Sequence, residues 1–563
     1  MATRLDWNLA DVWEKVAEVV PDAPAQIQGE RMFTWSEFDR RANGVAAALL
    51  DKRASPRDRV AQYLRNGPEY LEVAHAALKV GIPAVNTNYR YGGDELLYLW
   101  ENADVSCVVF HASFTERVDE LRARASSVRQ WIHVDDGTLR CPHWALPYEA
   151  AAGGCGQRSA VRSPWGRSSE DLFLLYTGGT TGMPKGVMWR SIDFLEQVND
   201  VGGVSYPLEE GVAAIPSRLT SPGRVHISAC PMMHGTGLFG AFITMHQGGC
   251  VVSLNGHNFD AAELLSEIEK HSVSSLAITG EVFARRILDA ASREPDRWDT
   301  SSVRNILSSG GILSEACKRD LLEYWPQATI LDGFSSSEGF GMGWSVATKS
   351  DIPATAAFSI GPDVMVLDAA DQPISPGSGV IGRLAVSGRV PQGYYKDPDK
   401  SAATFVEIGG RRMALPGDHA TVDVDGRIHL VGRNSLCINS GGEKIYTEEV
   451  EAVLLDHPAV TDALVVGIPD PVWGQAVAAV VSVDTSAPPS PADLVAHVKK
   501  RLAGYKAPKE IAFVDAVPRG PNGKPDYAAA RNLAERHRNA RPASTDLPSA
   551  GKIHDVEEFP VTR

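Results

Sequence analysis

The 563-residue sequence lacks an excess of positive charge, paired cysteines and long hydrophobic runs. Its net charge of -15 argues against a nucleic-acid partner and against binding to an anionic membrane surface. The seven cysteines are scattered and include no Cys-x-x-Cys pair, which favours reduced thiols over a disulfide framework or a zinc site. No apolar run is long enough to span a bilayer, and the first eight residues lack the apolar core of a signal peptide. We therefore expect no integral membrane segment and a cytoplasmic location.

The length of the chain predicts two or more domains, because a single hydrophobic core stops growing well below 563 residues. Strand-like apolar runs such as 105–110 alternate with amphipathic helical stretches such as 261–268, a pattern typical of helix-covered α/β sheets. Short strands separated by proline and glycine follow, and then a fresh α+β pattern. We expect an N-terminal domain over 1–432 with a small β subdomain at about 357–432, a small α+β domain over 433–540, and a loose tail at 541–563.

A loop of glycines and hydroxyls follows the strand-like run at 172–176, and residues 177–186 read Thr-Gly-Gly-Thr-Thr-Gly-Met-Pro-Lys-Gly. Glycine lets the backbone approach an anion, and successive free N–H groups form an anion-binding concavity. Pro184 precedes the lysine and no Gly-Lys-Ser/Thr occurs, which argues against a P-loop NTPase. A flexible Gly/Thr loop between two strands is the alternative interpretation. We predict a phosphate-binding loop that includes Thr177, Gly178, Gly179, Thr180, Thr181 and Lys185.

A second segment, 331–339, reads Leu-Asp-Gly-Phe-Ser-Ser-Ser-Glu-Gly and follows a strand-like run at 328–330. An aromatic ring can stack on a base, a hydroxyl can bond a phosphate, and a carboxylate can hold Mg²⁺. No Gly-x-Ser-x-Gly occurs here, which argues against a serine hydrolase. A serine-rich turn is the alternative to a nucleotide site.

These two segments resemble the signature motifs of the adenylate-forming superfamily, which includes acyl-CoA synthetases, aryl-CoA ligases, luciferases and peptide-synthetase adenylation domains. The resemblance covers about residues 10 to 535, with at least six motifs in the family's order. It implies a large adenylation domain, a small mobile C-terminal domain, and the use of ATP, Mg²⁺ and coenzyme A. It also implies a small-molecule carboxylate as substrate, and it leaves the oligomeric state and the pathway open.

The resemblance also assigns residues to the nucleotide. Glu338 takes the place of the acid that holds Mg²⁺, and Ser335 departs from the family by standing where glycine is usual. The segment 415–420 resembles the family's Thr-Gly-Asp motif, whose carboxylate can accept two ribose hydroxyls. Beyond the phosphate loop, the implied nucleotide-binding residues are Ser309, Gly310, Gly311, Asp332, Phe334, Ser337, Asp418 and Arg433.

Two C-terminal segments resemble parts that alternate at the active site in this family. Ser435 stands where many relatives carry the aspartate or lysine of the hinge. Residues 438–446 resemble the hairpin that acyl-CoA synthetases move against coenzyme A, which implies roles for Ser440, Gly441 and Gly442. The glycine-flanked Lys524 resembles the mobile catalytic lysine, whose ammonium would offset charge at the α-phosphate. The implied catalytic residues are Lys524, Glu338 and Lys185.

The acyl group is the least constrained part of the prediction. Residues 231–237 resemble a segment near the carboxylate, which points to His234 and Thr236, and Gly280 is a candidate for lining an acyl tunnel. The segments at 176–189, 231–235 and 438–444 look like those of bacterial synthetases for long-chain fatty acids and steroid side-chain acids. An aromatic or medium-chain acid, a carrier-protein thiol as acceptor, and a non-enzymatic acyl-nucleotide binding module remain alternatives.

Overall fold

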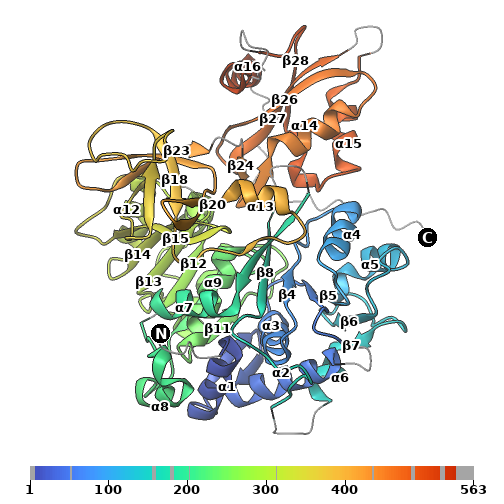
Figure 1. The fold of residues 1–563 in the computed structure, drawn as a ribbon, viewed down its shortest axis with the longest axis vertical. Helices are drawn as coiled ribbons and strands as arrows, with labels where there is room; N and C mark the ends of the chain where they lie inside the picture. Colours follow the sequence, from blue (N-terminus) through green and yellow to red (C-terminus); the bar gives the residue numbers. More distant parts are fainter. Residues whose placement is uncertain are drawn as a thin grey trace.

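The computed structural model describes residues 7–50, 54–154, 160–177, 183–201, 203–311, 313–433, 437–483, 488–519 and 526–540. Within them the chain forms two eight-stranded sheets, a seven-stranded sheet and a five-stranded sheet (Figure 1). The first three sheets belong to the large N-terminal domain, and the fourth forms the small C-terminal domain. The predicted α/β class is therefore confirmed, while the predicted boundaries remain predictions.

The first large sheet, called sheet A here, is parallel except at its two edges, where β15 and β2 run antiparallel to their neighbours. Its order is β15-β14-β13-β12-β10-β11-β1-β2. The strands are β1 (Pro24–Gln28), β2 (Arg31–Thr34), β10 (Val225–Ser228), β11 (Cys250–Ser253), β12 (Ser275–Ile278), β13 (Asn305–Ser309), β14 (Thr329–Ser336) and β15 (Gly339–Ala347).

The second large sheet, sheet B, has the order β19-β9-β8-β4-β3-β5-β6-β7. The antiparallel pair β8–β9 places Thr177 opposite Lys185, so the two ends of the predicted phosphate loop are register partners. The strands are β3 (Val60–Tyr63), β4 (Ala84–Asn86), β5 (Cys107–His111), β6 (Gln130–Val134), β7 (Leu146–Pro147), β8 (Leu172–Thr177), β9 (Lys185–Arg190) and β19 (Gly393–Tyr394).

Two smaller sheets follow in the chain. The antiparallel sheet of the β subdomain contains β16 (Ala357–Phe358), β17 (Val364–Leu367), β18 (Gly382–Val386), β20 (Phe405–Ile408), β21 (Arg411–Ala414), β22 (Asp418–Val422) and β23 (Ile428–Arg433). The C-terminal sheet contains β24 (Cys437–Ser440), β25 (Glu443–Tyr446), β26 (Val460–Asp470), β27 (Gly474–Val483) and β28 (Glu510–Phe513). Figure 1 shows the C-terminal sheet and its helices stacked on one end of the large domain.

The helices cover the faces of the sheets. Those of the N-terminal domain are α1 (Leu9–Val19), α2 (Trp35–Leu49), α3 (Pro68–Val80), α4 (Gly93–Asn102), α5 (Thr115–Arg122), α6 (Tyr148–Gly153), α7 (Ser191–Val201), α8 (Ile215–Arg218), α9 (Gly235–His246), α10 (Ala261–His271), α11 (Gly280–Arg293), α12 (Glu315–Tyr324) and α13 (Pro398–Thr404). The C-terminal domain carries α14 (Thr447–Leu455), α15 (Pro491–Lys499) and α16 (Tyr527–Ala540). No helix of the described ranges combines the length and the apolar character that crossing a bilayer requires.

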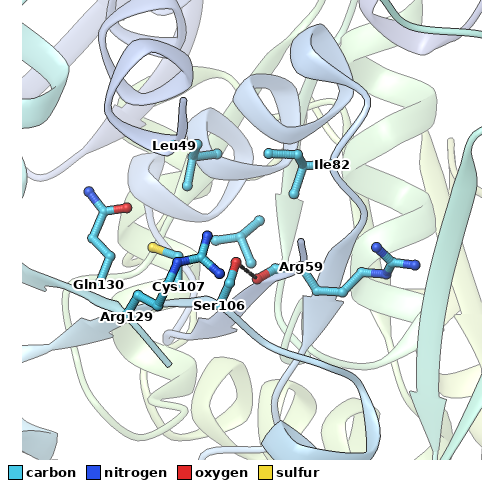
Figure 2. Close-up of a pocket in the computed structure, with 8 residues that line it drawn as sticks. Leu49, Arg59, Ile82, Ser106, Cys107, Arg129 and Gln130 are labelled. Carbon is cyan, nitrogen blue, oxygen red and sulfur yellow. Dashed lines mark hydrogen bonds between the residues drawn. The ribbon is translucent and has the colours of Figure 1, made fainter. Parts of the chain in front are cut away.

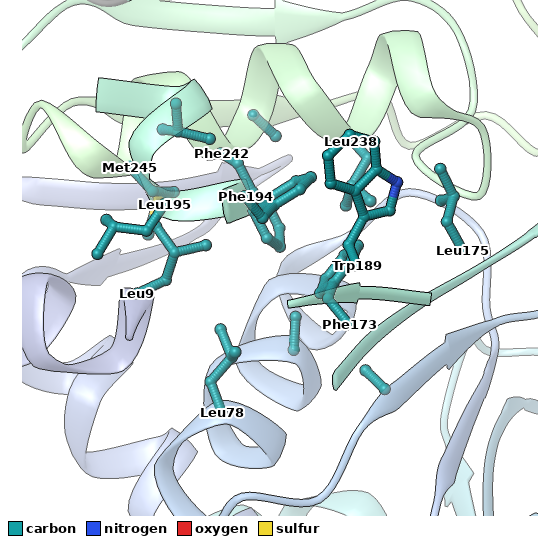
Figure 3. Packing of buried hydrophobic residues seen from close by; sticks show 14 of the residues in the cluster. Leu9, Leu78, Phe173, Leu175, Trp189, Phe194, Leu195, Leu238, Phe242 and Met245 are labelled. Carbon is teal, nitrogen blue, oxygen red and sulfur yellow. The ribbon is translucent and has the colours of Figure 1, made fainter. Parts of the chain in front are cut away.

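The largest hydrophobic core lies between the two large sheets, where α3, α7 and α9 pack. Phe173 stacks on Phe194 with ring centroids 4.5 Å apart, and Phe242 meets Trp13 edge-on at 5.0 Å. Figure 3 shows these phenylalanines beside Leu195 and Met245, where sheet B meets α9. Offset and edge-on aromatic contacts of this kind stabilise a core beyond the burial of their area. The core therefore fixes α9 relative to both sheets.

Close helix packing at the edge of this core depends on one glycine. A Cβ atom on Gly44 of α2 would lie 2.3 Å from the carbonyl oxygen of Ala152 in α6. Gly153, in the same helix α6, has open space where its Cβ would be. The two positions form a matched pair, because both lie in helices and only one is crowded.

Gly44→Ala should lower the unfolding temperature, because backbone must shift to admit the methyl group at a cost of about 1–3 kcal/mol. Gly153→Ala should leave it unchanged or raise it, since alanine is favoured over glycine in helices by roughly 0.5–1 kcal/mol. Thermal unfolding of the two variants and the parent measures both effects. Equal unfolding temperatures for the two variants would contradict the close α2–α6 contact.

Candidate active site

A cavity of about 560 Å³ lies between α9 and one face of sheet A. Side chains alternate between the two faces of a strand, and Ile306 and Ile330 pack in the core on the α10–α12 side. Leu307, Ser309 and Leu331 are on the opposite face and line the cavity. Gly442 and Tyr505 of the C-terminal domain line it as well. The cavity is therefore a site built by both domains.

Several residues predicted from the sequence meet in this cavity. They come from the ends of β8, β13 and β14, from the start of α9, and from the C-terminal hairpin. They are Thr177, His234, Thr236, Ser309, Gly310, Ser337 and Gly442. The chain thus brings together motifs that are up to 265 residues apart, since 442 - 177 = 265.

Glycines surround Thr279 at the centre of this group. A Cβ on Gly310 would lie 3.6 Å from Thr279 Cγ2, and a Cβ on Gly442 would lie 3.4 Å from the same atom. Both glycines have positive φ, +80° and +88°, which other residues rarely adopt. Thr236 Oγ1 donates to the Ser309 carbonyl at 3.2 Å and ties α9 to β13. The arrangement leaves narrow space bounded largely by main chain.

Two of the three charged candidates, Glu338 and Lys185, lie beside Tyr394. Glu338 Oε1 accepts a hydrogen bond of 2.8 Å from the Tyr394 hydroxyl, and Lys185 Nζ lies 5.6 Å from the centroid of the same ring. Lys185 Nζ is also 3.5 Å from Asp397 Oδ2. Burial lowers the pKa of Lys185, and nearby Lys400 lowers it further. Tyr394 therefore links two of the predicted catalytic residues, while Lys524 lies outside the described residues.

Three predicted residues have surroundings that narrow their roles. The Asp332 carboxylate lies 2.9 Å from Lys318 Nζ on the α12 side of the sheet, and Asp332 is not among the residues that line the cavity. Phe334 lies within β14, not in a loop, and its ring faces Phe358 at 5.8 Å. Gly280 begins α11, and the described lining of the cavity includes its neighbour Thr279 instead.

Asp418 and Arg433 are register partners across β22 and β23, and the Asp418 side chain is buried. Gly311 lies beside Thr279, and Gly441 packs its main chain on Trp473 next to Ser440. The remaining predictions fall outside the described residues, namely Gly178, Gly179, Thr180, Thr181, the hinge residue Ser435, Lys524 and the tail at 541–563.

Buried charges hold the glycine hairpin against the large domain. Glu443 Oε1 lies 3.2 Å from His234 Nε2, and Glu443 Oε2 accepts from the Asn88 amide at 3.1 Å. Arg90 adds a guanidinium nitrogen at 3.5 Å. Burial would raise the pKa of Glu443, but His234, Arg90 and Asn88 lower it to about 2. The ionised carboxylate is thus held by three residues of the other domain.

A second cluster, the Lys506 cluster, joins the domains nearby. Lys506 Nζ contacts Glu95 Oε1 of α4 at 2.6 Å and Glu449 Oε2 of α14 at 2.8 Å, with all three side chains about 1% exposed. Glu95 Oε2 also accepts from the main-chain N–H of Ala503. Burial raises the pKa of Glu449 to about 7, although Lys506 opposes this. One cation therefore bridges carboxylates of both domains.

Sequence reasoning missed Asn86, Asn88, Thr279, Tyr394 and the Lys506 cluster. Asn86 donates to the carbonyls of Tyr176 and Met233, at 2.8 and 2.7 Å, and so joins the phosphate strand to the 231–237 segment. The sequence did contain one indication of this role. Asn86 ends a parallel strand, and functional polar residues are common at the carboxyl ends of such strands.

Another recess, behind sheet B, has a volume of only about 10 Å³. Figure 2 shows its lining, in which Leu49 and Ile82 face polar residues and Ser106 Oγ donates to the Arg59 carbonyl at 3.2 Å. Arg129 is paired with Asp58 at 2.7 Å. A volume of this size holds about one water molecule, so the recess is too small for a substrate.

The fold and the two-domain cavity define a nucleotide-dependent enzyme, and comparison with known families agrees. The family model "AMP-binding enzyme" matches residues 13–395, and "AMP-binding enzyme C-terminal domain" matches residues 449–524. The chain belongs to the AMP-binding enzyme family. The resemblance stated from the sequence is thereby confirmed.

More specific relatives are CoA ligases. A medium/long-chain-fatty-acid–CoA/3-oxocholest-4-en-26-oate–CoA ligase of Mycolicibacterium smegmatis is 38% identical, over 94% of this chain and 96% of the relative. A 3-oxocholest-4-en-26-oate–CoA ligase of Rhodococcus rhodochrous is 36% identical, over 93% and 95%. Among solved structures, an amide bond synthetase from Marinactinospora thermotolerans superposes with a TM-score of 0.75 at 23% identity, over 93% of this chain and 99% of that one. The last likeness concerns the fold alone.

Lys506→Met should loosen the docked C-terminal domain, because removing one partner of a buried ionic cluster costs roughly 3–5 kcal/mol. We expect a larger radius of gyration by small-angle X-ray scattering, together with slower thioester formation. Lys499→Met is the control, since Lys499 is exposed at the end of α15. Identical scattering for both variants would show that the cluster does not hold the domains together.

Proposed function

We propose that this chain is an AMP-forming acyl-CoA synthetase, an acid–thiol ligase that converts a carboxylic acid, ATP and coenzyme A to acyl-CoA, AMP and pyrophosphate. The observation that carries the proposal is the position of the glycine hairpin, Gly441–Gly442. Gly442 lies beside Thr279 and lines the cavity. A main chain without side chains in that place leaves room for a slender thiol-bearing arm to reach the acyl carbon. The named activities of the relatives support the same reaction class.

The reaction has two halves. The substrate carboxylate attacks the α-phosphorus of ATP, pyrophosphate leaves, and an acyl-adenylate forms. The thiol of coenzyme A then attacks the acyl carbon, its proton is lost, and AMP leaves. In our proposal Lys524 balances the charge that develops in the first half, and the Gly441–Gly442 hairpin admits the thiol in the second. Closure by the C-terminal domain keeps water from the adenylate.

The other predicted residues divide between the parts of the nucleotide. The loop from Thr177 to Lys185 would hold phosphates, the turn at 309–311 would hold the base, and Asp418 with Arg433 would hold the ribose. Glu338 is our candidate for holding Mg²⁺, which typically takes one or two protein carboxylates together with substrate phosphates. Bound there, the ion would offset phosphate charge. Tyr394 orients this carboxylate through the hydrogen bond from its hydroxyl.

The acid that fits best is a long-chain fatty acid or a steroid side-chain acid. Phe239 and Ile243 of α9 face Leu307 and Leu331 of sheet A across the cavity, which makes its middle apolar. The 38%-identical relative is named for both kinds of acid. We place the enzyme in the cytoplasm, where ATP and coenzyme A are available.

Pyrophosphate release, measured across fatty, aromatic and steroid carboxylates, tests the function. We expect ATP-dependent release followed by formation of an acyl-CoA when coenzyme A is present. Lys524→Ala should nearly abolish release, while thioester formation from supplied acyl-AMP should remain largely intact. Equal loss of both halves would remove Lys524 from its assigned role. An adenylate that accumulates and never reaches coenzyme A would favour a carrier-protein thiol.

The hairpin is tested separately. Gly442→Leu should spare adenylate formation and impair the coenzyme A step, because the side chain meets Thr279 and the positive φ is strained. Gly379→Leu is the matched control, since Gly379 also has positive φ, +70°, but has open space around it. The two half-reactions are assayed in both variants. Loss of adenylation in Gly442→Leu alone would assign the hairpin to the nucleotide half.

A further inference from the structure

The cavity face of sheet A is organised in rows that cross the strands. The row nearest the reacting end comprises Thr279, Ser309 and Gly333. Two residues back along each strand, the next row comprises Ala277, Leu307 and Leu331. Two residues further, the register partners are His226, Ser275, Asn305 and Thr329, and all four line the cavity. From the carboxyl ends of the strands to their starts, the wall of the cavity is therefore first polar, then apolar, then polar again.

The far row is unusual for the wall of a lipid-binding cavity. His226 is bonded to Ser275 Oγ and Ser228 Oγ, both at 3.1 Å, and burial lowers its pKa to about 3, so the ring is neutral. The neutral His226 ring forms part of the wall of the cavity at this row. Asn305 and Thr329 present an amide and a hydroxyl to the cavity beside it. Thr329 is half-buried and Asn305 is exposed, so this end of the cavity lies close to the molecular surface.

Arg224 adds a cation at the same end. It stands two residues before His226, on the same face by strand alternation, and it lines the cavity. Its guanidinium donates to Gln247 Oε1 at 3.2 Å. Burial lowers its pKa, and within the described ranges of the chain no carboxylate opposes that effect. The half-buried guanidinium has further N–H groups besides the one that Gln247 accepts, and an oxygen of a bound ligand can accept from them.

The spacing suits a substrate that spans both ends. Four residues separate Ser309 from Asn305, which corresponds to about 13 Å along a parallel strand. The cavity-lining residues of α9 run from Thr236 to Thr244, which corresponds to about 12 Å along a helix. Both walls therefore put the distal polar row roughly 12–13 Å from the reacting end.

We propose that the acids this enzyme prefers carry a hydrogen-bond-accepting oxygen at the end remote from the reacting carboxylate, and that Arg224, Asn305 and Thr329 recognise it. This inference rests on the proposed acyl-CoA synthetase function and specifies its substrate class. Arg224 can only donate hydrogen bonds, and the Asn305 amide and the Thr329 hydroxyl can each donate one, which matches a ketone oxygen or the oxygens of a second carboxylate. The 3-oxo group in the substrate names of two relatives would be such an oxygen, far from the 26-carboxylate.

Discrimination follows from the polar groups themselves. A substrate oxygen that accepts from Arg224 adds a hydrogen bond that the analogue without this oxygen cannot make. A hydrogen bond to a charged group contributes enough to change kcat/KM by about tenfold or more. The effect should be largest at one chain length, since the oxygen must reach the far row.

The test measures kcat/KM for acyl-CoA formation with straight-chain acids of increasing length, each beside its terminal keto acid and its dicarboxylic acid. We expect one length at which an oxygenated acid exceeds the plain acid by about tenfold. Arg224→Met should bring that ratio close to one. Thr329→Val, which keeps the shape of the side chain, should lower it severalfold and serves if Arg224→Met folds poorly. Arg319→Met, an exposed arginine on α12, should keep the parental ratio.

The outcomes separate the two oxygens and the two hypotheses. If dicarboxylic acids exceed plain acids in kcat/KM and only Arg224→Met removes this difference, the recognised group is an ionised carboxylate. If keto acids exceed plain acids and both Arg224→Met and Thr329→Val remove the difference, the recognised group is a carbonyl. If plain and oxygenated acids of every length give equal kcat/KM in the parent, the inference is overturned. The proposed synthetase function would still stand. The absence of pyrophosphate release with any acid would overturn both.

Discussion

The pleat of sheet A is the constraint on which the site depends. Because side chains alternate, the same strands contribute Ile306 and Ile330 to a core and Leu307 and Leu331 to the cavity. Helix α9 can approach the cavity face only where its side chains are small. A Cβ on Gly240 would lie 2.8 Å from His226 Nε2, so this glycine sets the distance between helix and sheet. Larger neighbours on α9 then define the width of the cavity.

The second constraint is electrostatic and concerns how the domains meet. Glu443 and Lys506 are buried; Glu443 is held by partners from the large domain, and Lys506 bridges Glu95 of the large domain and Glu449 of its own domain. Buried ion pairs gain Coulomb energy but lose hydration, so their net contribution is small when they form completely and large when one partner is missing. Such contacts suit the proposed movement of the C-terminal domain, which would dock in one orientation and also undock. When the domains separate, the charges of Glu443 and Lys506 would be hydrated again. A misaligned docking would leave them buried without their partners.

The motifs made the family, the fold class and much of the site accessible from the sequence. Glycine and hydroxyl loops after apolar strands have a local physical meaning, and Thr177, Ser309 and Gly310 do line the cavity. What lay beyond sequence reasoning depends on side chains that are far apart along the chain. The pairing of Asp332 with Lys318 comes from packing of α12 on sheet A, and Lys506 meets Glu95 across 411 residues. Gly280 begins α11 and its neighbour Thr279 lines the cavity, so the tunnel role of Gly280 stays a prediction.

The two ends of the cavity are built from different kinds of residue. This difference explains why the sequence predicts the reaction more precisely than it predicts the substrate. The reacting end is made of glycines and main chain at the carboxyl ends of strands, whose demands on φ and close approach leave a mark in the local sequence. The far end is made of ordinary side chains at the starts of β12, β13 and β14, where serine, asparagine and threonine are common for other reasons. Only strand register shows that Ser275, Asn305 and Thr329 form one row, and only the fold places Arg224 beside it. If the far row recognises the substrate as proposed, substitutions at the strand starts would change selectivity without altering the residues at the strand ends.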